Sequence, residues 1–201
     1  MRKRWMMALA GMAALGLVAC LDGCSQADAV KAASTIHGYL PTVMGLASDA
    51  AATLEALDPS DVQEVQAVNS KVQVELQELE SVSGAYAAAP TAEGWTSLQS
   101  VVDSLVSDAD QGLLAALAIK NPQSQAQVKA AMSALDAVVH VLDGYLMAAR
   151  SPDEVKAAAA NRSVKVQSVV RYWSQGDWQR VEQAFGTKGE ALAGVEMQLG
   201  F

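Results

Sequence analysis

Breaks that contain proline divide this chain of 201 residues at nearly regular intervals. The four breaks are Asp58-Pro59-Ser60, Ala89-Pro90-Thr91, Asn121-Pro122 and Ser151-Pro152. Proline interrupts a helix but fits its first turn, and Ser, Thr and Asn are common capping residues. We therefore expect Ser60, Asn121 and Ser151 to begin helices, with a weaker form of the same pattern at Thr91. Successive prolines lie 31, 32 and 30 residues apart, which leaves room for helices of about 28 residues and about 42 Å.

Apolar residues recur in steps of three and four between these breaks. This spacing is typical of helices that pack side by side. The two most regular stripes are Ile36, Leu40, Val43, Ala47, Ala50, Leu54 and Leu57, and Val128, Ala131, Leu135, Val138, Leu142, Tyr145 and Ala149. Looser stripes are formed by Val65, Val68, Val72, Leu76, Leu79, Val82 and Tyr86, and by Trp95, Leu98, Val102, Leu105, Ala109, Leu113 and Leu117.

The predicted fold class is all-α, an up-and-down antiparallel helical bundle of four long helices plus a fifth helix and a short C-terminal helical element. Short connections make neighbouring long helices antiparallel, because none is long enough to return along a helix. Pro41 is expected to kink the first helix or to mark where its ordered part begins. The expected helices span residues 26–57, 60–88, 92–120, 122–150 and 152–173, followed by shorter pieces over 177–185 and 189–199.

The first 19 residues have the build of a secretory signal peptide. Arg2, Lys3 and Arg4 supply the positive start, and residues 5–19 form an uncharged apolar stretch. This stretch is shorter than the about 20 residues that a transmembrane helix needs. We therefore expect a processed export signal in preference to a membrane span.

The end of this stretch together with the following cysteine, Leu17-Val18-Ala19-Cys20, resembles the lipobox of bacterial lipoproteins. The resemblance implies that Cys20 receives a diacylglycerol and becomes the mature N-terminus. It covers only the first 24 residues. It also implies a cell-envelope protein that is attached to the membrane through its N-terminal lipid and faces the periplasm or the cell surface.

Cys24 is the alternative lipidation site, within Leu21-Asp22-Gly23-Cys24. Asp22 would then lie in a segment that belongs in the bilayer, where a carboxylate is costly. An ordinary signal peptide is a further alternative. The spacing of the two cysteines fits neither a c-type haem motif nor a four-ligand zinc site, and a disulfide across so few residues would be strained.

The expected domains are a signal peptide over 1–19, a lipidated N-terminus and tether over 20–25, and a single helical-bundle domain over 26–201. Without the basic start, the chain holds 11 basic and 22 acidic residues. Such a surface repels nucleic acid, so we expect no nucleic-acid partner.

Bundles hold metals and haem through histidines on facing helices, which makes His37 and His140 the first residues to consider. His37 follows the stripe residue Ile36, and His140 falls midway between Val138 and Leu142. Both are therefore expected to point outward. Neither belongs to a Glu-x-x-His pattern, so we expect no metal site and no cofactor.

Acidic residues form two further groups. Glu75, Glu78 and Glu80, with Asp61 and Glu64 upstream, are expected to form a solvated face, with weak divalent-cation binding as the alternative. Another group resembles fragments of a calcium loop, but Gly112 is not where the EF-hand glycine belongs and the flanking residues continue a helix. This second group is Asp103, Asp108 and Asp110.

No nucleophile with histidine and acid partners is visible in the sequence, so the chain is expected not to be an enzyme. The segment 162–186 combines aromatic and basic residues, which are common anchors of protein interfaces. The candidate partner surface consists of Arg162, Arg171, Trp173, Trp178 and Arg180. The alternative is that these aromatic residues close one end of the bundle core.

These observations favour an exported lipoprotein with a non-catalytic structural or protein-interaction role, with an envelope protein as its expected partner. The alternative function is a small-molecule or cofactor binder that uses the bundle interior. Methionines in the predicted core favour this alternative, because they adapt to irregular packing.

Overall fold

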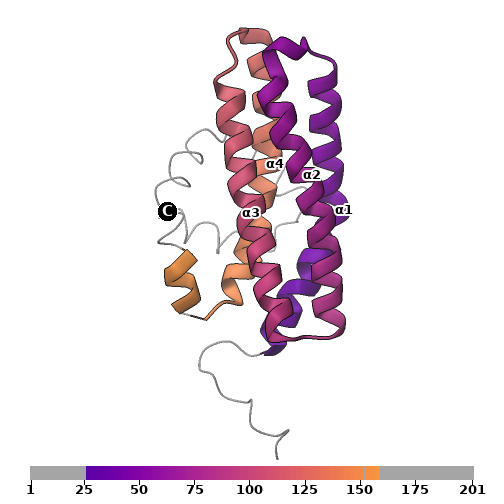
Figure 1. Cartoon of the computed structure of the whole chain (residues 1–201), viewed down its shortest axis with the longest axis vertical. Coiled ribbons are helices and arrows are strands. Elements are labelled where there is room, and N and C mark those ends of the chain that lie inside the picture. Colours follow the sequence, from indigo (N-terminus) through magenta and orange to yellow (C-terminus); the bar gives the residue numbers. More distant parts are fainter. Residues whose placement is uncertain (1–25, 152, 159–201) are drawn as a thin grey trace, which may run out of the picture.

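Four long helices form an all-α bundle in the computed structural model, which describes residues 26–151 and 153–158 (Figure 1). The helices are α1 (Gln26–Glu55), α2 (Pro59–Ala88), α3 (Ala92–Leu117) and α4 (Pro122–Ala148). Each packs against the next in sequence, and α4 also packs against α1, which closes the bundle. The antiparallel up-and-down arrangement predicted from the short connections is thus confirmed.

The predicted apolar stripes form the core. In the first stripe, the residues from Ile36 to Leu54 are each at most 1% exposed, and Leu57 packs against them from a partly buried position. Gly112 of α3 lies opposite Met132 of α4, where a Cβ atom would come within 2.4 Å of the methionine Cε. The helices therefore approach closely at this level, and the interior there is filled by side chains.

Of the predicted starts of α2, α3 and α4, two are confirmed and one is wrong. The side chains of Thr91 and Asn121 accept hydrogen bonds from backbone N–H groups of the first turns of α3 and α4. Ser60, however, lies inside α2, and Asp58 is the cap. Pro59 explains the difference, because its fixed φ fits the first helical position and moves the capping position one residue earlier.

Helix α1 continues through Pro41 without interruption, so its ordered part does not begin there. Helices α1, α3 and α4 end two or three residues earlier than predicted. A fifth helix is described from Asp153 to Ala158. The remainder of this predicted helix, the two C-terminal pieces and the segment 1–25 lie outside the described residues.

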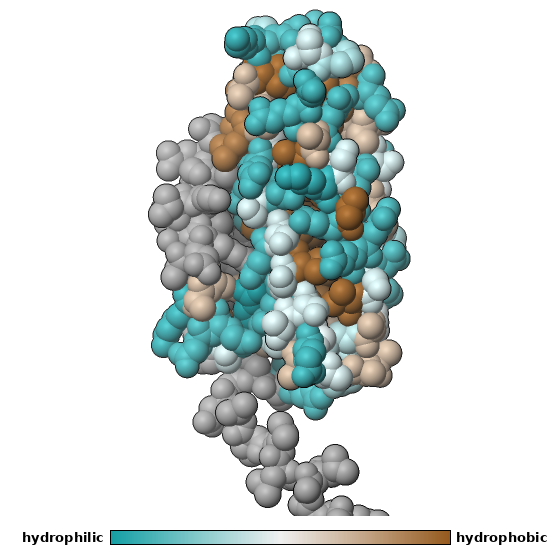
Figure 2. Space-filling view, in the orientation of Figure 1, coloured by the Kyte–Doolittle hydropathy of each residue, from teal (hydrophilic) through white to brown (hydrophobic). Residues whose placement is uncertain are grey.

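Helix α4 differs from the other three in its burial. Every residue from Met132 to Gly144 is buried, so this part of the helix has no exposed stripe. By length and composition α4 could cross a membrane, but 78% of its most apolar window is buried in the structure. Burial to this extent is typical of a helix in the interior of a folded protein. Much of the surface seen in Figure 2 is hydrophilic.

Candidate functional site: a buried aspartate and histidine cluster

The most unusual polar group of the described bundle lies at the contact between α3 and α4. It contains Asp110 of α3 with Asp136, His140 and Asp143 of α4, and each residue is at most 3% exposed. The prediction that His140 points outward is therefore wrong. That prediction assumed a single buried stripe on α4, whereas the whole circumference of the helix is buried around His140.

Helical spacing brings these side chains together. Asp136 and His140 are four residues apart, and Asp143 follows three residues later, so all three share one face of α4. His140 Nε2 lies 3.0 Å from Asp110 Oδ1 and 3.8 Å from Asp136 Oδ1. One ligand atom from each of Asp110, Asp136 and His140 lies within 4.8 Å of the other two.

The surrounding carboxylates control the charge of His140. Burial alone would lower the pKa of its imidazole. The hydrogen bond to Asp110 and the negative charges of Asp136, Asp110 and Asp143 oppose this effect and raise the pKa to about 9. The imidazole of the metal-free cluster is thus positively charged at neutral pH.

Ser133 lies one helical turn before Asp136 on the same side of α4. Its side chain is buried, and within the described part of the chain its Oγ has no hydrogen-bond partner. Side chains on a helix lean toward its N-terminus, so Asp136 leans toward the turn that holds Ser133. A buried hydroxyl without a partner is uncommon, because its loss of hydration costs about 1–3 kcal/mol.

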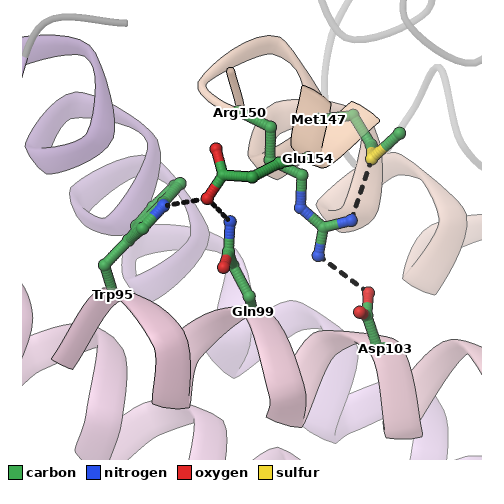
Figure 3. A network of polar contacts seen from close by, with 6 residues as sticks. All are labelled: Trp95, Gln99, Asp103, Met147, Arg150 and Glu154. Atoms are coloured by element: carbon green, nitrogen blue, oxygen red, sulfur yellow. Dashed lines mark hydrogen bonds and ion pairs between the residues drawn. The ribbon is translucent and has the colours of Figure 1, made fainter. Parts of the chain in front are cut away.

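A second polar network joins the end of α4 to α3 (Figure 3). Arg150 is buried and donates to Asp103 Oδ1 at 2.8 Å and to Met147 Sδ at 3.1 Å. Burial lowers the pKa of Arg150, and the charges of Asp143 and Glu154 act in the opposite direction. Arg150 therefore interacts electrostatically with Asp143 of the buried cluster and with Glu154 of the fifth helix.

Glu154 attaches this fifth helix to α3 (Figure 3). Its Oε1 accepts hydrogen bonds from Trp95 Nε1 at 3.3 Å and from Gln99 Nε2 at 2.9 Å. Its Oε2 accepts one from the Ser151 backbone at 2.7 Å, while Ser151 Oγ accepts from the Glu154 backbone at 3.4 Å. The last two bonds form a capping box, which confirms the predicted helix start at Ser151. Burial alone would raise the pKa of Glu154, but these hydrogen bonds lower it.

The structure separates the three aspartates that resembled a calcium loop. They lie on the continuous helix α3 and face different partners. Asp103 binds Arg150, Asp110 binds His140, and Asp108 faces Glu75 of α2. The sequence similarity to a calcium loop therefore has no counterpart in the arrangement of these side chains.

The predicted acidic face of α2 is only partly solvated. Glu64, Glu78 and Glu80 are exposed, whereas Asp61 accepts a hydrogen bond from Ser124 Oγ at 3.3 Å. Glu75 is partly buried, and burial together with the nearby Asp108 carboxylate raises its pKa to about 7. Glu75 is therefore close to half ionised at neutral pH.

His37 is exposed, in agreement with the sequence prediction. Its Nδ1 lies 3.2 Å from Ser83 Oγ, and its ring packs over Gly84. This pair resembles a nucleophile and base only in composition, because Ser83 is 0% exposed and cannot reach a substrate.

The sequence-predicted lipidation and partner residues lie outside the described part of the chain. They are Cys20, Cys24, Arg162, Arg171, Trp173, Trp178 and Arg180. The residues that the structure brings together are instead acidic and basic groups at the α3–α4 contact. One imidazole and two nearby carboxylates can form a buried ion-pair network, and they are also donors that metal ions accept.

Comparison of the chain with protein-family models, curated proteins and solved structures finds no match in any of the three.

Proposed function

We propose that the chain is an exported bacterial lipoprotein with a non-catalytic structural or protein-interaction role in the cell envelope. A lipid on Cys20 would attach it to a membrane, and the bundle would face the periplasm or the cell surface. The observation that carries this proposal is Leu17-Val18-Ala19-Cys20, at the end of an apolar stretch that follows a positive start.

The contacts of the described bundle support a non-catalytic role. Charged groups whose pKa values are raised or lowered, such as His140 and Glu154, bind side chains of another helix. Such groups often mark catalytic sites, but ion pairs that hold helices together perturb pKa values in the same way. The burial of Ser83 beneath His37 removes the one serine and histidine pair among the described hydrogen bonds that resembles a nucleophile.

The alternative function, binding of a small molecule inside the bundle, needs internal space. At the level of Gly112, Met132 Cε and Val68 Cγ1 already occupy the position beside the glycine. The packing at this level therefore favours a filled core.

The test is the intact mass of the membrane-extracted protein, measured beside matched Cys20→Ala and Cys24→Ala variants. We expect a diacylglyceryl-sized adduct on the wild type and on Cys24→Ala, and its loss from Cys20→Ala together with release into the soluble fraction. Loss from Cys24→Ala alone would move the lipid to Cys24. A wild-type chain without the adduct would contradict the anchoring proposal.

The interaction role has a separate test at Trp178, in the predicted partner surface. Trp178→Ala is expected to leave helicity and melting temperature unchanged while weakening the capture of an envelope protein by the full chain. A large fall in melting temperature would show instead that Trp178 closes the bundle core.

A further inference from the structure

We propose that Asp110, Asp136 and His140 together bind one divalent first-row transition-metal ion, of which Zn²⁺ is the representative. This site goes beyond the proposed envelope role and does not depend on which cysteine is lipidated. It links the middle of α4 to α3 inside the bundle.

The distances between the three side chains agree with a shared ion. Zinc binds nitrogen and carboxylate oxygen at about 2.0–2.2 Å, which places neighbouring ligand atoms of a tetrahedral site about 3.3–3.6 Å apart. His140 Nε2 lies 3.0 Å from Asp110 Oδ1 and 3.8 Å from Asp136 Oδ1. All three ligand atoms lie within 4.8 Å of one another, so small side-chain rotations suffice to bring them around one ion.

The donor set determines the class of metal. Imidazole nitrogen suits zinc, iron, nickel and copper, whereas calcium and magnesium prefer oxygen ligands alone. Asp110 and Asp136 supply one oxygen each, and His140 supplies the nitrogen that selects for a transition-metal ion. Three protein ligands leave at least one further position for a water molecule or another ligand.

The charge and burial of the cluster also suit a divalent ion. Asp110, Asp136 and His140 are each at most 3% exposed, so bulk water solvates these groups poorly. An ion of charge +2 would offset the two ligand carboxylates while the imidazole stays neutral, and Asp143 adds a further carboxylate close to His140.

Ser133 supplies an independent observation beside the site. Its buried hydroxyl lies one turn from Asp136 and has no hydrogen-bond partner within residues 26–151 and 153–158. A water molecule that completes the metal coordination would be a suitable partner for this hydroxyl. We therefore expect Ser133→Ala to weaken metal binding by about 10-fold, which is the usual effect of losing an outer hydrogen bond.

The test uses the full chain after treatment with a chelator and removal of the chelator. Titration calorimetry with Zn²⁺ is expected to show one ion bound per chain, and Co²⁺ is expected to give the visible absorption of a site with nitrogen and oxygen ligands. The melting temperature should rise with one equivalent of Zn²⁺. Absence of stoichiometric binding would overturn the proposal and leave the cluster as an ion-pair network.

Variants assign the ion to these residues. Asp110→Asn, Asp136→Asn and His140→Gln are expected to lose the Co²⁺ absorption and the Zn²⁺-dependent rise in melting temperature. Asp110→Asn and Asp136→Asn preserve side-chain size, so they keep the test decisive if His140→Gln fails to fold.

The matched controls are His37→Gln and Asp103→Asn. His37 is an exposed histidine, and Asp103 is a carboxylate of α3 that binds Arg150. Both variants should retain full metal binding. Loss of binding in His37→Gln, or full binding in both Asp110→Asn and Asp136→Asn, would contradict the assignment.

Discussion

Asp110 Oδ1 lies 3.0 Å from His140 Nε2, and this contact links α3 to the centre of α4. Both side chains are at most 5% exposed, so replacing Asp110 leaves the imidazolium buried without this counter-charge. We expect Asp110→Asn to lower the free energy of unfolding by about 3 kcal/mol, measured by urea denaturation with a chelator present.

The control for this variant is Asp49→Asn, because Asp49 is an exposed carboxylate on α1. Its effect should stay within about 0.5 kcal/mol. An equally small effect of Asp110→Asn would mean that the buried pair adds no net stability to the bundle.

Glu75 makes the stability of the bundle depend on pH. Its pKa rises from 4.5 to about 7 on folding, so the folded state binds more protons between these values. The free energy of unfolding should therefore fall as the pH rises from about 4.5 to about 7. Burial is the largest cause, followed by Asp108 of α3 and Glu78 of α2, while Lys71 acts in the opposite direction.

Glu75→Gln is expected to remove this component of the pH dependence and to stabilise the protein at pH 8. Solvent screening at this partly exposed side chain limits the gain to about 1 kcal/mol. Thermal unfolding at pH 5 and pH 8 measures the effect, with Glu64→Gln as control, because Glu64 is an exposed carboxylate of the same helix and is not among the groups that act on Glu75. Equal pH profiles for wild type and Glu75→Gln would refute the role given to Glu75.

Asn121 caps the first turn of α4. Its Oδ1 accepts from the backbone N–H groups of Gln123 at 3.0 Å and Ser124 at 3.3 Å. Asn121→Ala should lower the free energy of unfolding by about 1 kcal/mol, measured in urea, because both amides lose this acceptor. Asn121→Asp retains an acceptor and should remain close to wild type. Similar losses in the two variants would show that the cap is not the cause.

Glu154 holds the start of the fifth helix to α3 through Trp95 and Gln99. Glu154→Ala removes both bonds and the capping box, so hydrogen exchange of residues 153–158 is expected to become at least about 10-fold faster. The exposed Asp153→Ala provides the control. Unchanged exchange in Glu154→Ala would mean that other contacts hold this turn.

Predictions from the sequence were most accurate where a single physical effect determines the local structure. Apolar spacing located the core positions from Ile36 to Leu54, and capping chemistry located the start of α4 at Asn121. At α2 two effects compete, and the preference of Pro59 for the first helical turn moved the cap from Ser60 to Asp58.

The sequence analysis missed the buried cluster because it relied on the apolar stripe of α4. Such a stripe indicates which residues face the neighbouring helices, but it does not show how much of the remaining helix surface is buried. A position midway between Val138 and Leu142 is outside such a stripe, yet His140 is only 2% exposed. The spacing of Asp136, His140 and Asp143 on one face of an otherwise apolar segment was the available signal. The partner on α3 could not be inferred, because it depends on the relative height of the two helices.

The burial of α4 on all sides has a consequence for how the chain tolerates sequence change. Helix α2 has one buried face and one exposed face. A saturation mutational scan should therefore show a tolerance of substitutions that rises and falls about every 3.6 positions along this helix. From Met132 to Gly144 that rhythm should be absent, because no position faces solvent. Residues 132–144 should then accept fewer substitutions than any segment of similar length in the other helices. Their sequence should also change most slowly during evolution.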